Sequence, residues 1–155
     1  RKKILSAVKG CAIASDQAYR ESDLAIDYCE DVPALSKSAV EQIVNIFKQE
    51  GAVAKVSSIH VNGWFGNYDK LSMTRILLDE SFQTDMDKSQ EQIVFCGDSP
   101  NDAPMFGFFQ NSVGVANVID YAEELEQQPC WVTQKRAAAG FVELAEALMA
   151  AHSDA

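Results

Sequence analysis

Two carboxylates, Asp98 and Asp102, stand four positions apart directly after the short apolar run 93–96. The run has the length and bulk of a buried strand, Gly97 permits a sharp bend, and the following residues are typical of a helix start. If the strand belongs to a parallel sheet, both carboxylates lie at its carboxyl edge. Mg²⁺ prefers carboxylate oxygens, water and substrate phosphate, so this spacing predicts a magnesium site that serves phosphate chemistry.

The same residues could also form a helix cap without any further role. Ser99 as the N-cap residue, Pro100 at the first helical position and Asp102 at the third would satisfy free backbone N–H groups. Such a cap does not account for Asp98 or Asn101, and a charge beside a buried strand costs free energy unless something pairs with it. We therefore favour a functional interpretation.

Lys70 is the candidate cation for a bound phosphate. It lies in the first turn of an expected helix, where a positive charge opposes the helix dipole by about 0.3–1 kcal/mol, so its placement calls for a reason. A solvated lysine at the end of a loop is the ordinary alternative. The position of Lys70 ahead of the acidic motif favours the functional interpretation.

The segment 97–102, Gly-Asp-Ser-Pro-Asn-Asp, resembles the motif that closes the active site of haloacid dehalogenase-like (HAD) phosphohydrolases. The resemblance implies that Asp98 ligates Mg²⁺, that Asp102 supports the metal, usually through water, and that Asn101 lies near the phosphate. It also implies that Lys70 pairs with the nucleophile and the phosphate, as in the sugar-phosphatase-like members of the family.

Residues 1–66 resemble the latter part of an α+β cap domain, the substrate-specificity domain of this family. Asn62-Gly63 is a strong turn signal and precedes an aromatic patch. The expected elements are a helical or irregular lead-in over 1–20, a strand over 23–30, a helix from Ser36 to Gly51 and a strand over 53–61.

Residues 67–155 alternate helical and strand patterns, which predicts an α/β fold with a doubly wound parallel sheet. The resemblance identifies this part as the C-terminal half of the Rossmann-like HAD core. Helices are expected over 71–82, 103–109, 119–125 and 141–150, and strands over 93–96, 112–115 and 130–133.

The resemblance extends over this second half, because segments 113–117 and 140–142 look like later landmarks of the family. It favours the branch whose cap is inserted between the second and third motifs. The family's nucleophile lies on an Asp-x-Asp-x-Thr/Val strand ahead of the cap, and we find no such segment here. Asp85 and Asp87 form an Asp-x-Asp pair in a polar loop, where we interpret them as solvated turn residues. We therefore expect the sequence to be the later part of a larger gene product.

The net charge of −10 argues against nucleic acid or an anionic membrane as a general partner. The sequence contains no apolar run long enough to span a bilayer and no signal-peptide pattern, so we expect a cytoplasmic protein. The cysteines lack metal-ligand spacing and are expected to be buried free thiols. They are Cys11, Cys29, Cys96 and Cys130.

The resemblance implies a Mg²⁺-dependent phosphohydrolase that acts on a small phosphorylated metabolite, such as a sugar phosphate. The mechanism would proceed through an aspartyl-phosphate whose aspartate lies outside this chain, so we expect the chain alone to be inactive. Four polar residues near the aromatic turn are candidates for contacts to the leaving group, although ordinary surface roles remain open. They are Arg20, Ser58, His60 and Asn62.

Three alternatives use the same residues differently. In the first, the chain is a non-catalytic Mg²⁺-binding fragment or interaction module. In the second, Asp98 and Asp102 bind the metal of a phosphomutase of the same superfamily. The third, a Gly-Asp-Ser esterase with Ser99 as nucleophile, would need an Asp three residues before His152, and that residue is Met149.

The strand that carries the family's nucleophile would lie beside 93–96 in the sheet. Without it, 93–96 has an unpaired apolar edge, which predicts association with the missing N-terminal segment or with a second copy of the chain.

Overall fold

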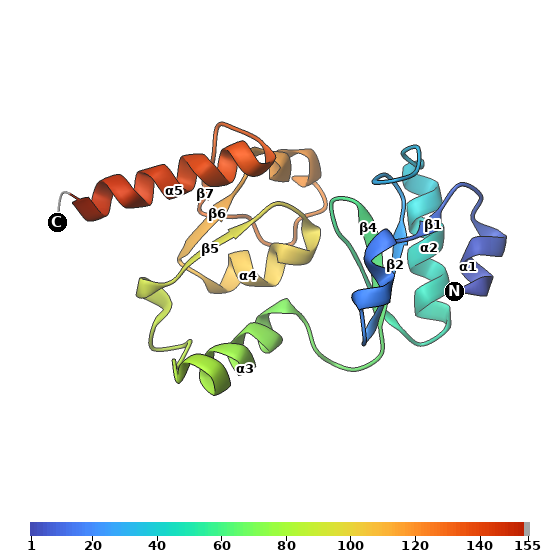
Figure 1. The fold of residues 1–155 in the computed structure, drawn as a ribbon, viewed down its shortest axis with the longest axis horizontal. Coiled ribbons are helices and arrows are strands. Elements are labelled where there is room, and N and C mark those ends of the chain that lie inside the picture. The colour runs from blue at the N-terminus through green and yellow to red at the C-terminus, as the bar shows by residue number, and fades with distance from the viewer. Residues whose placement is uncertain (154–155) are drawn as a thin grey trace. The chain divides into compact units, whose positions relative to one another are not determined.

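The computed structural model describes residues 1–153, and the chain divides into two compact units between Asn67 and Tyr68 (Figure 1). Unit 1 begins at Arg1 and ends at Asn67, and unit 2 begins at Tyr68. Each unit has its own sheet, and unit 1 has one hydrophobic core whereas unit 2 has two small ones.

Unit 1 is an antiparallel sheet with helices packed against it. The sheet has four strands in the order β1-β2-β4-β3. Its strands are β1 (Ala12–Ile13), β2 (Asp23–Asp27), β3 (Val53–Val56) and β4 (His60–Trp64). The helices are α1 (Lys2–Ala7), the 3-10 turn η1 (Ser15–Tyr19) and α2 (Lys37–Gln49). The helix expected after Ser36 is confirmed, because the Ser36 hydroxyl accepts a hydrogen bond from the Ala39 backbone N–H at 3.3 Å.

The sheet of unit 1 has one apolar and one polar face. Ile26 of β2 and Val61 of β4 are fully buried and pack in one cluster with Ile43 and Phe47 of α2. Since successive strand residues point to opposite faces, His60 and the other even-numbered residues of β4 lie on the face turned away from this core. The face of the sheet that carries His60 is therefore the one that α2 does not cover.

The prediction of a turn at Asn62-Gly63 is wrong. Both residues lie within β4, and the chain reverses at Ser57–Ile59 between β3 and β4 instead. A Cβ atom on Gly63 would lie 2.2 Å from Cε1 of the Phe47 ring, so the absence of a side chain serves the close approach of α2. The irregular lead-in also contains β1, a short strand that pairs with β2.

Unit 2 contains a parallel sheet of three strands in the order β5-β6-β7 (Figure 1). The α/β class and the parallel pairing expected from the sequence are confirmed. The strands are β5 (Val94–Gly97), β6 (Asn111–Gly114) and β7 (Trp131–Val132). The helices are α3 (Lys70–Phe82), α4 (Ala103–Phe108) and α5 (Ala137–Ser153), with 3-10 turns η2 (Gln90–Gln92), η3 (Pro100–Asp102) and η4 (Ala116–Tyr121). The helix expected over 119–125 is wrong, because only its first three residues lie in a helical element, the 3-10 turn η4, which begins earlier.

Phe95 of β5 joins the two small cores of unit 2. Its ring meets Phe106 edge-on with centroids 5.5 Å apart and stacks on Phe109 with centroids 6.1 Å apart. These contacts bind β5 to α4 on either side of the loop that carries the acidic motif. The loop therefore connects β5 and α4, and the ring contacts of Phe95 hold its two ends in place.

Three further sequence expectations meet the structure in unit 2. Within the described residues β5 pairs only with β6, so its other edge is unpaired, and Val94 is 39% exposed. Cys130 is exposed, which contradicts the expectation of a buried thiol, because it lies ahead of the short edge strand β7. Asp85 and Asp87 are exposed and form ion pairs with Lys88 and Arg75, as expected for solvated turn residues. No helix in residues 1–153 is long and apolar enough to cross a membrane.

Candidate functional site

The acidic loop directly follows β5 at the carboxyl edge of the parallel sheet. Asp102 turns its carboxylate back toward the strand end, where Oδ2 accepts hydrogen bonds from the backbone N–H groups of Asp98 at 2.8 Å and Ser99 at 3.2 Å. A Cβ atom on Gly97 would lie 2.6 Å from that oxygen, so glycine is required for this close approach. The Asp102 carboxylate thereby closes the turn that presents Asp98.

Lys70 neutralises this buried carboxylate. Asp69 caps α3 by accepting a hydrogen bond from the Ser72 backbone N–H at 2.8 Å, and it places Lys70 in the first turn. The Lys70 ammonium donates to Oδ1 of Asp102. The Asp102 side chain is only 3% exposed and the Lys70 side chain is 42% exposed. The pair therefore links a buried charge to a cation that still reaches solvent.

Asp98, Ser99 and Asn101 form a second group on the same loop. Ser99 is buried, and its hydroxyl lies 3.0 Å from Oδ1 of Asp98 and 2.9 Å from Oδ1 of Asn101. Asp98 and Asn101 are themselves half-buried, so both polar groups remain within reach of a ligand. Oδ2 of Asp98 takes part in none of the hydrogen bonds found within residues 1–153.

The donor set of this loop fits part of a magnesium site. Mg²⁺ commonly takes one or two carboxylates and completes its shell with water and phosphate oxygens. Asp98 has a free carboxylate oxygen, whereas both oxygens of Asp102 already accept hydrogen bonds from the protein. Residues 1–153 hold no group of three or more His, Cys, Asp or Glu side chains that could bind a metal. The described chain thus offers one direct carboxylate ligand and a second carboxylate that shapes the loop.

Arg20, a predicted substrate contact in unit 1, is engaged by two carboxylates. Its guanidinium donates to both Asp16 oxygens at 2.8 and 2.9 Å and to Oδ2 of Asp23 at 2.8 Å. Asp23 pairs with Trp64, and Asp27 pairs with His60, so Arg20 acts at the opposite end of β2 from His60. The structure therefore brings His60 and Ser58 to one end of the sheet and Arg20 to the other.

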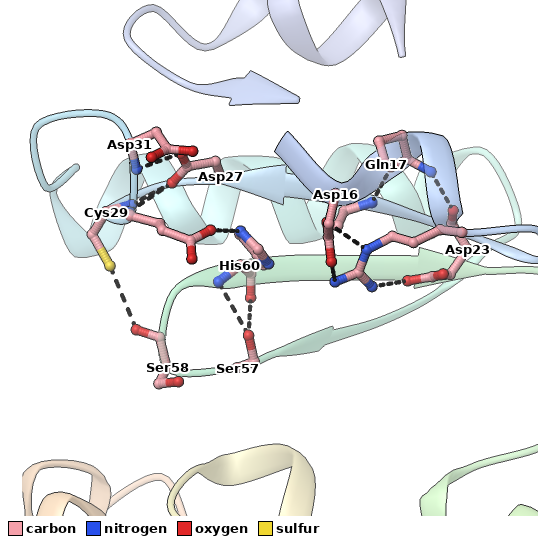
Figure 2. A network of polar contacts seen from close by, with 12 residues as sticks. Asp16, Gln17, Asp23, Asp27, Cys29, Asp31, Ser57, Ser58 and His60 are labelled. Carbon is pink, nitrogen blue, oxygen red and sulfur yellow. Dashed lines mark hydrogen bonds and ion pairs between the residues drawn. The ribbon is translucent and has the colours of Figure 1, made fainter. Parts of the chain in front are cut away.

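His60 is buried and paired with Glu30, whose carboxylate oxygen lies 2.8 Å from Nε2 of the ring (Figure 2). Asp27, across the strand pair from His60, accepts backbone N–H bonds from Cys29, Glu30 and Asp31 at 2.8–2.9 Å. Burial raises the pKa of Asp27, but the three N–H donors outweigh it, and the pKa ends below its ordinary value. Asp27 thus shapes the loop from which Glu30 reaches His60.

Ser58 lies in a turn that is joined to the loop after β2 (Figure 2). Its carbonyl accepts a hydrogen bond from the Cys29 thiol at 3.4 Å. Tyr28 donates to the same turn twice, from its hydroxyl to the Ser57 carbonyl at 2.7 Å and from its backbone N–H to the Ile59 carbonyl at 3.2 Å. These bonds fix the turn that leads into His60.

Asn62 lies in the middle of β4, between Ala25 of β2 and Lys55 of β3. Its side-chain Oδ1 is buried, and among the described residues it is the one buried side-chain oxygen or nitrogen without a hydrogen-bond partner. An unpaired buried acceptor costs about 1–3 kcal/mol. Asn62 shares a face of the sheet with His60, so these two of the four predicted contacts lie on one surface.

Comparison with known proteins relates the chain to solved structures. It matches the sucrose-phosphatase from Synechocystis sp. PCC6803, solved in complex with sucrose and phosphate, with a TM-score of 0.62, 18% identity and 92% of this chain covered. It also matches protein 0175 from Thermoplasma acidophilum, with a TM-score of 0.55, 20% identity and 87% of this chain covered. The matches span 58% and 55% of those two chains, respectively. No protein-family model and no curated protein sequence matches this chain. These likenesses establish a shared α/β fold.

Two residues, one in each unit, have contacts that the sequence does not predict. The sequence suggests a helix cap or an esterase nucleophile for Ser99, whereas the structure places its hydroxyl within reach of both Asp98 and Asn101. Glu30 was taken as a strand residue, and nothing in the local pattern indicates its contact with His60, which is thirty positions away.

Proposed function

We propose that this chain is the later part of a Mg²⁺-dependent phosphohydrolase of the HAD superfamily, of the sugar-phosphatase-like branch. In this proposal unit 2 is half of the catalytic core and unit 1 is part of the cap. The carrying observation is the loop at the carboxyl edge of the parallel sheet, where Asp98 keeps a free oxygen and Lys70 is paired with Asp102. The fold shared with the Synechocystis sucrose-phosphatase supports the same assignment.

In the proposed reaction each residue of the loop has a defined task. Asp98 and the loop closed by Asp102 would hold Mg²⁺, and the bound ion would supply positive charge to the phosphoryl oxygens. Lys70, partly exposed, adds positive charge beside the phosphate, and Asn101 contributes an amide to a phosphate oxygen. An aspartate outside residues 1–155 would attack phosphorus and displace the alcohol of the substrate, which takes a proton from solvent as it leaves. Water would then cleave the aspartyl-phosphate, releasing inorganic phosphate and the free aspartate.

The proposed substrate is a small phosphorylated metabolite such as a sugar phosphate. On the polar face of unit 1, His60 is held by Glu30, and Asn62 has an unpaired acceptor oxygen. That oxygen is buried, so a ligand hydroxyl would bond to it only by displacing the atoms that cover it. Ser58 is a candidate at the neighbouring turn. Arg20 is the weakest of the four, because its guanidinium already binds two carboxylates.

The proposal extends to the setting of the enzyme. We place it in the cytoplasm, with neither nucleic acid nor membrane as a partner, in keeping with its net charge of −10. The unpaired edge of β5 would receive the missing N-terminal segment or a second copy of the chain.

A non-catalytic Mg²⁺-binding or interaction module is the second candidate. It is favoured by the edge of β5 that no strand of residues 1–153 covers, because such an edge can pair with a strand of another chain. The two candidates differ in whether the gene product containing this sequence turns over phosphate esters.

The deciding experiment is hydrolysis of p-nitrophenyl phosphate by that gene product, with Mg²⁺ and with EDTA. We expect turnover that requires Mg²⁺ and is abolished by Asp98→Asn. Asp85→Asn, on an exposed ion pair of unit 2, serves as the control and should retain activity. Near-normal activity in Asp98→Asn would refute the metal assignment, and absence of Mg²⁺-dependent turnover in the wild type would favour the binding module. Turnover by residues 1–155 alone would place the nucleophile within this chain.

A further inference from the structure

Ser99 faces two acceptors with a single proton. Its hydroxyl lies 3.0 Å from Oδ1 of Asp98 and 2.9 Å from Oδ1 of Asn101, and the side chain is only 2% exposed. A hydroxyl carries one O–H bond and two lone pairs, so it donates to one of these oxygens at a time. The other contact would then place two oxygen atoms at hydrogen-bonding distance without a proton between them.

The chemistry of the two partners decides which contact receives the proton. An ionised carboxylate only accepts hydrogen bonds, and an O–H bond to a charged acceptor is roughly twice as strong as one to a neutral acceptor. An amide can exchange its oxygen and nitrogen by a half-turn that leaves its shape unchanged. The conflict is therefore removed if the hydroxyl donates to Asp98 and the Asn101 amide turns its nitrogen toward Ser99.

The geometry points to Ser99 as a positioning residue that orients both polar groups of the loop. Its hydroxyl donates to Oδ1 of Asp98, which leaves Oδ2 for a cation, and it accepts a hydrogen bond from Nδ2 of Asn101. Nδ2 carries two N–H bonds, so the second remains for an anionic oxygen of a bound ligand. The consequence for a metal ion and a phosphate rests on the proposed function. The orientation of the Asn101 amide does not.

Nuclear magnetic resonance of the 155-residue chain, labelled with ¹⁵N and without metal, tests the amide orientation directly. In the wild type we expect one of the two Nδ2 protons of Asn101 to be protected from exchange with solvent. Ser99→Ala should remove this protection, and Ser99→Thr should restore it because threonine keeps the hydroxyl. Unchanged protection of the Asn101 amide in Ser99→Ala would overturn the inference.

A second buried hydroxyl provides the matched control. Ser112 is fully buried in unit 2, donates to the Phe106 carbonyl at 3.3 Å and accepts from the Cys130 backbone N–H at 3.2 Å. Ser112→Ala removes a similarly buried hydroxyl away from the loop. The Nδ2 proton of Asn101 should remain as protected from exchange in this variant as in the wild type. If Ser112→Ala also removes the protection of the Asn101 Nδ2 proton, loss of any buried hydroxyl has this effect, and the specific role of Ser99 is overturned.

The positioning of the Asp98 carboxylate is tested by the affinity for Mg²⁺. This affinity is measured by titration with Mg²⁺, followed by the backbone amide signal of Asp98. Because partners of metal ligands typically contribute 10–100-fold to metal affinity, we expect Ser99→Ala to weaken binding by at least about 10-fold and Ser99→Thr to stay near the wild type. Equal affinity in Ser99→Ala would refute the effect on Asp98. If the wild type binds no Mg²⁺ while the Asn101 signal still depends on Ser99, the metal proposal fails and the amide orientation stands.

Discussion

The pairing of Lys70 with Asp102 predicts a measurable coupling in the stability of unit 2. The Asp102 carboxylate accepts from the backbone N–H groups of Asp98 and Ser99 on one oxygen and from Lys70 on the other. Asparagine has only one acceptor oxygen, so Asp102→Asn must direct its NH₂ group toward donors on one side. Since a hydrogen bond to a charged group contributes about 1.5–3 kcal/mol, we expect this variant to lose roughly 2–4 kcal/mol.

Lys70→Met removes the other partner of the same contact. The Asp102 carboxylate keeps its two backbone donors, and the Lys70 side chain is 42% exposed, so solvent screens part of the interaction. We expect a loss of about 1–2 kcal/mol. In the double variant, methionine also removes the clash between the Lys70 ammonium and the new NH₂ group, so the combined loss should fall below the sum by about 1 kcal/mol or more.

Urea unfolding followed by tryptophan fluorescence measures these changes for each unit. The chain has two tryptophans, Trp64 in unit 1 and Trp131 in unit 2, so a Trp64→Phe background reports on unit 2 alone. Asp120→Asn is the control, because Asp120 pairs with Arg136 at the surface with both side chains more than half exposed, and its midpoint should match that of its parent. Additive losses, or an Asp102→Asn variant as stable as its parent, would refute the buried pairing.

Two further predictions concern unit 1, with Trp64 as the probe in a Trp131→Phe background. Because the pKa of Asp27 is held below its unfolded value of about 3.9, its contribution to stability is present above that pH and is lost as the pH falls through the folded pKa. Unfolding measured from pH 6 downward should therefore depend less on pH in Asp27→Asn, and an unchanged pH profile would contradict the role of its N–H donors. Gly63→Ala should lower the unfolding free energy of unit 1 by about 1–3 kcal/mol, because its Cβ would lie 2.2 Å from the Phe47 ring. An unfolding midpoint equal to that of the parent would contradict this prediction and show that the Phe47 ring moves aside at no cost.

The elements that local patterns specify agree with the structure. The apolar stripe after Ser36 forms α2 because its period matches the helical turn, and its cap satisfies the first backbone donors. The run ending at Gly97 forms a strand because it is short, bulky and followed by a bend. Asn62-Gly63 misled the same reasoning, because a glycine that permits close packing and a glycine that permits a turn look alike in sequence.

The amino-acid sequence by itself indicated the α/β class, the parallel sheet of unit 2 and the place of Asp98 and Asp102 directly after β5. Each of these was read from patterns within short segments, namely the alternation of helical and strand segments and the bend after a bulky apolar run. Only the tertiary structure decided that Lys70, thirty-two positions away, neutralises Asp102, and that Glu30 fastens His60. A buried charge must find its partner in space, and the partner is selected by the packing of whole elements rather than by sequence spacing.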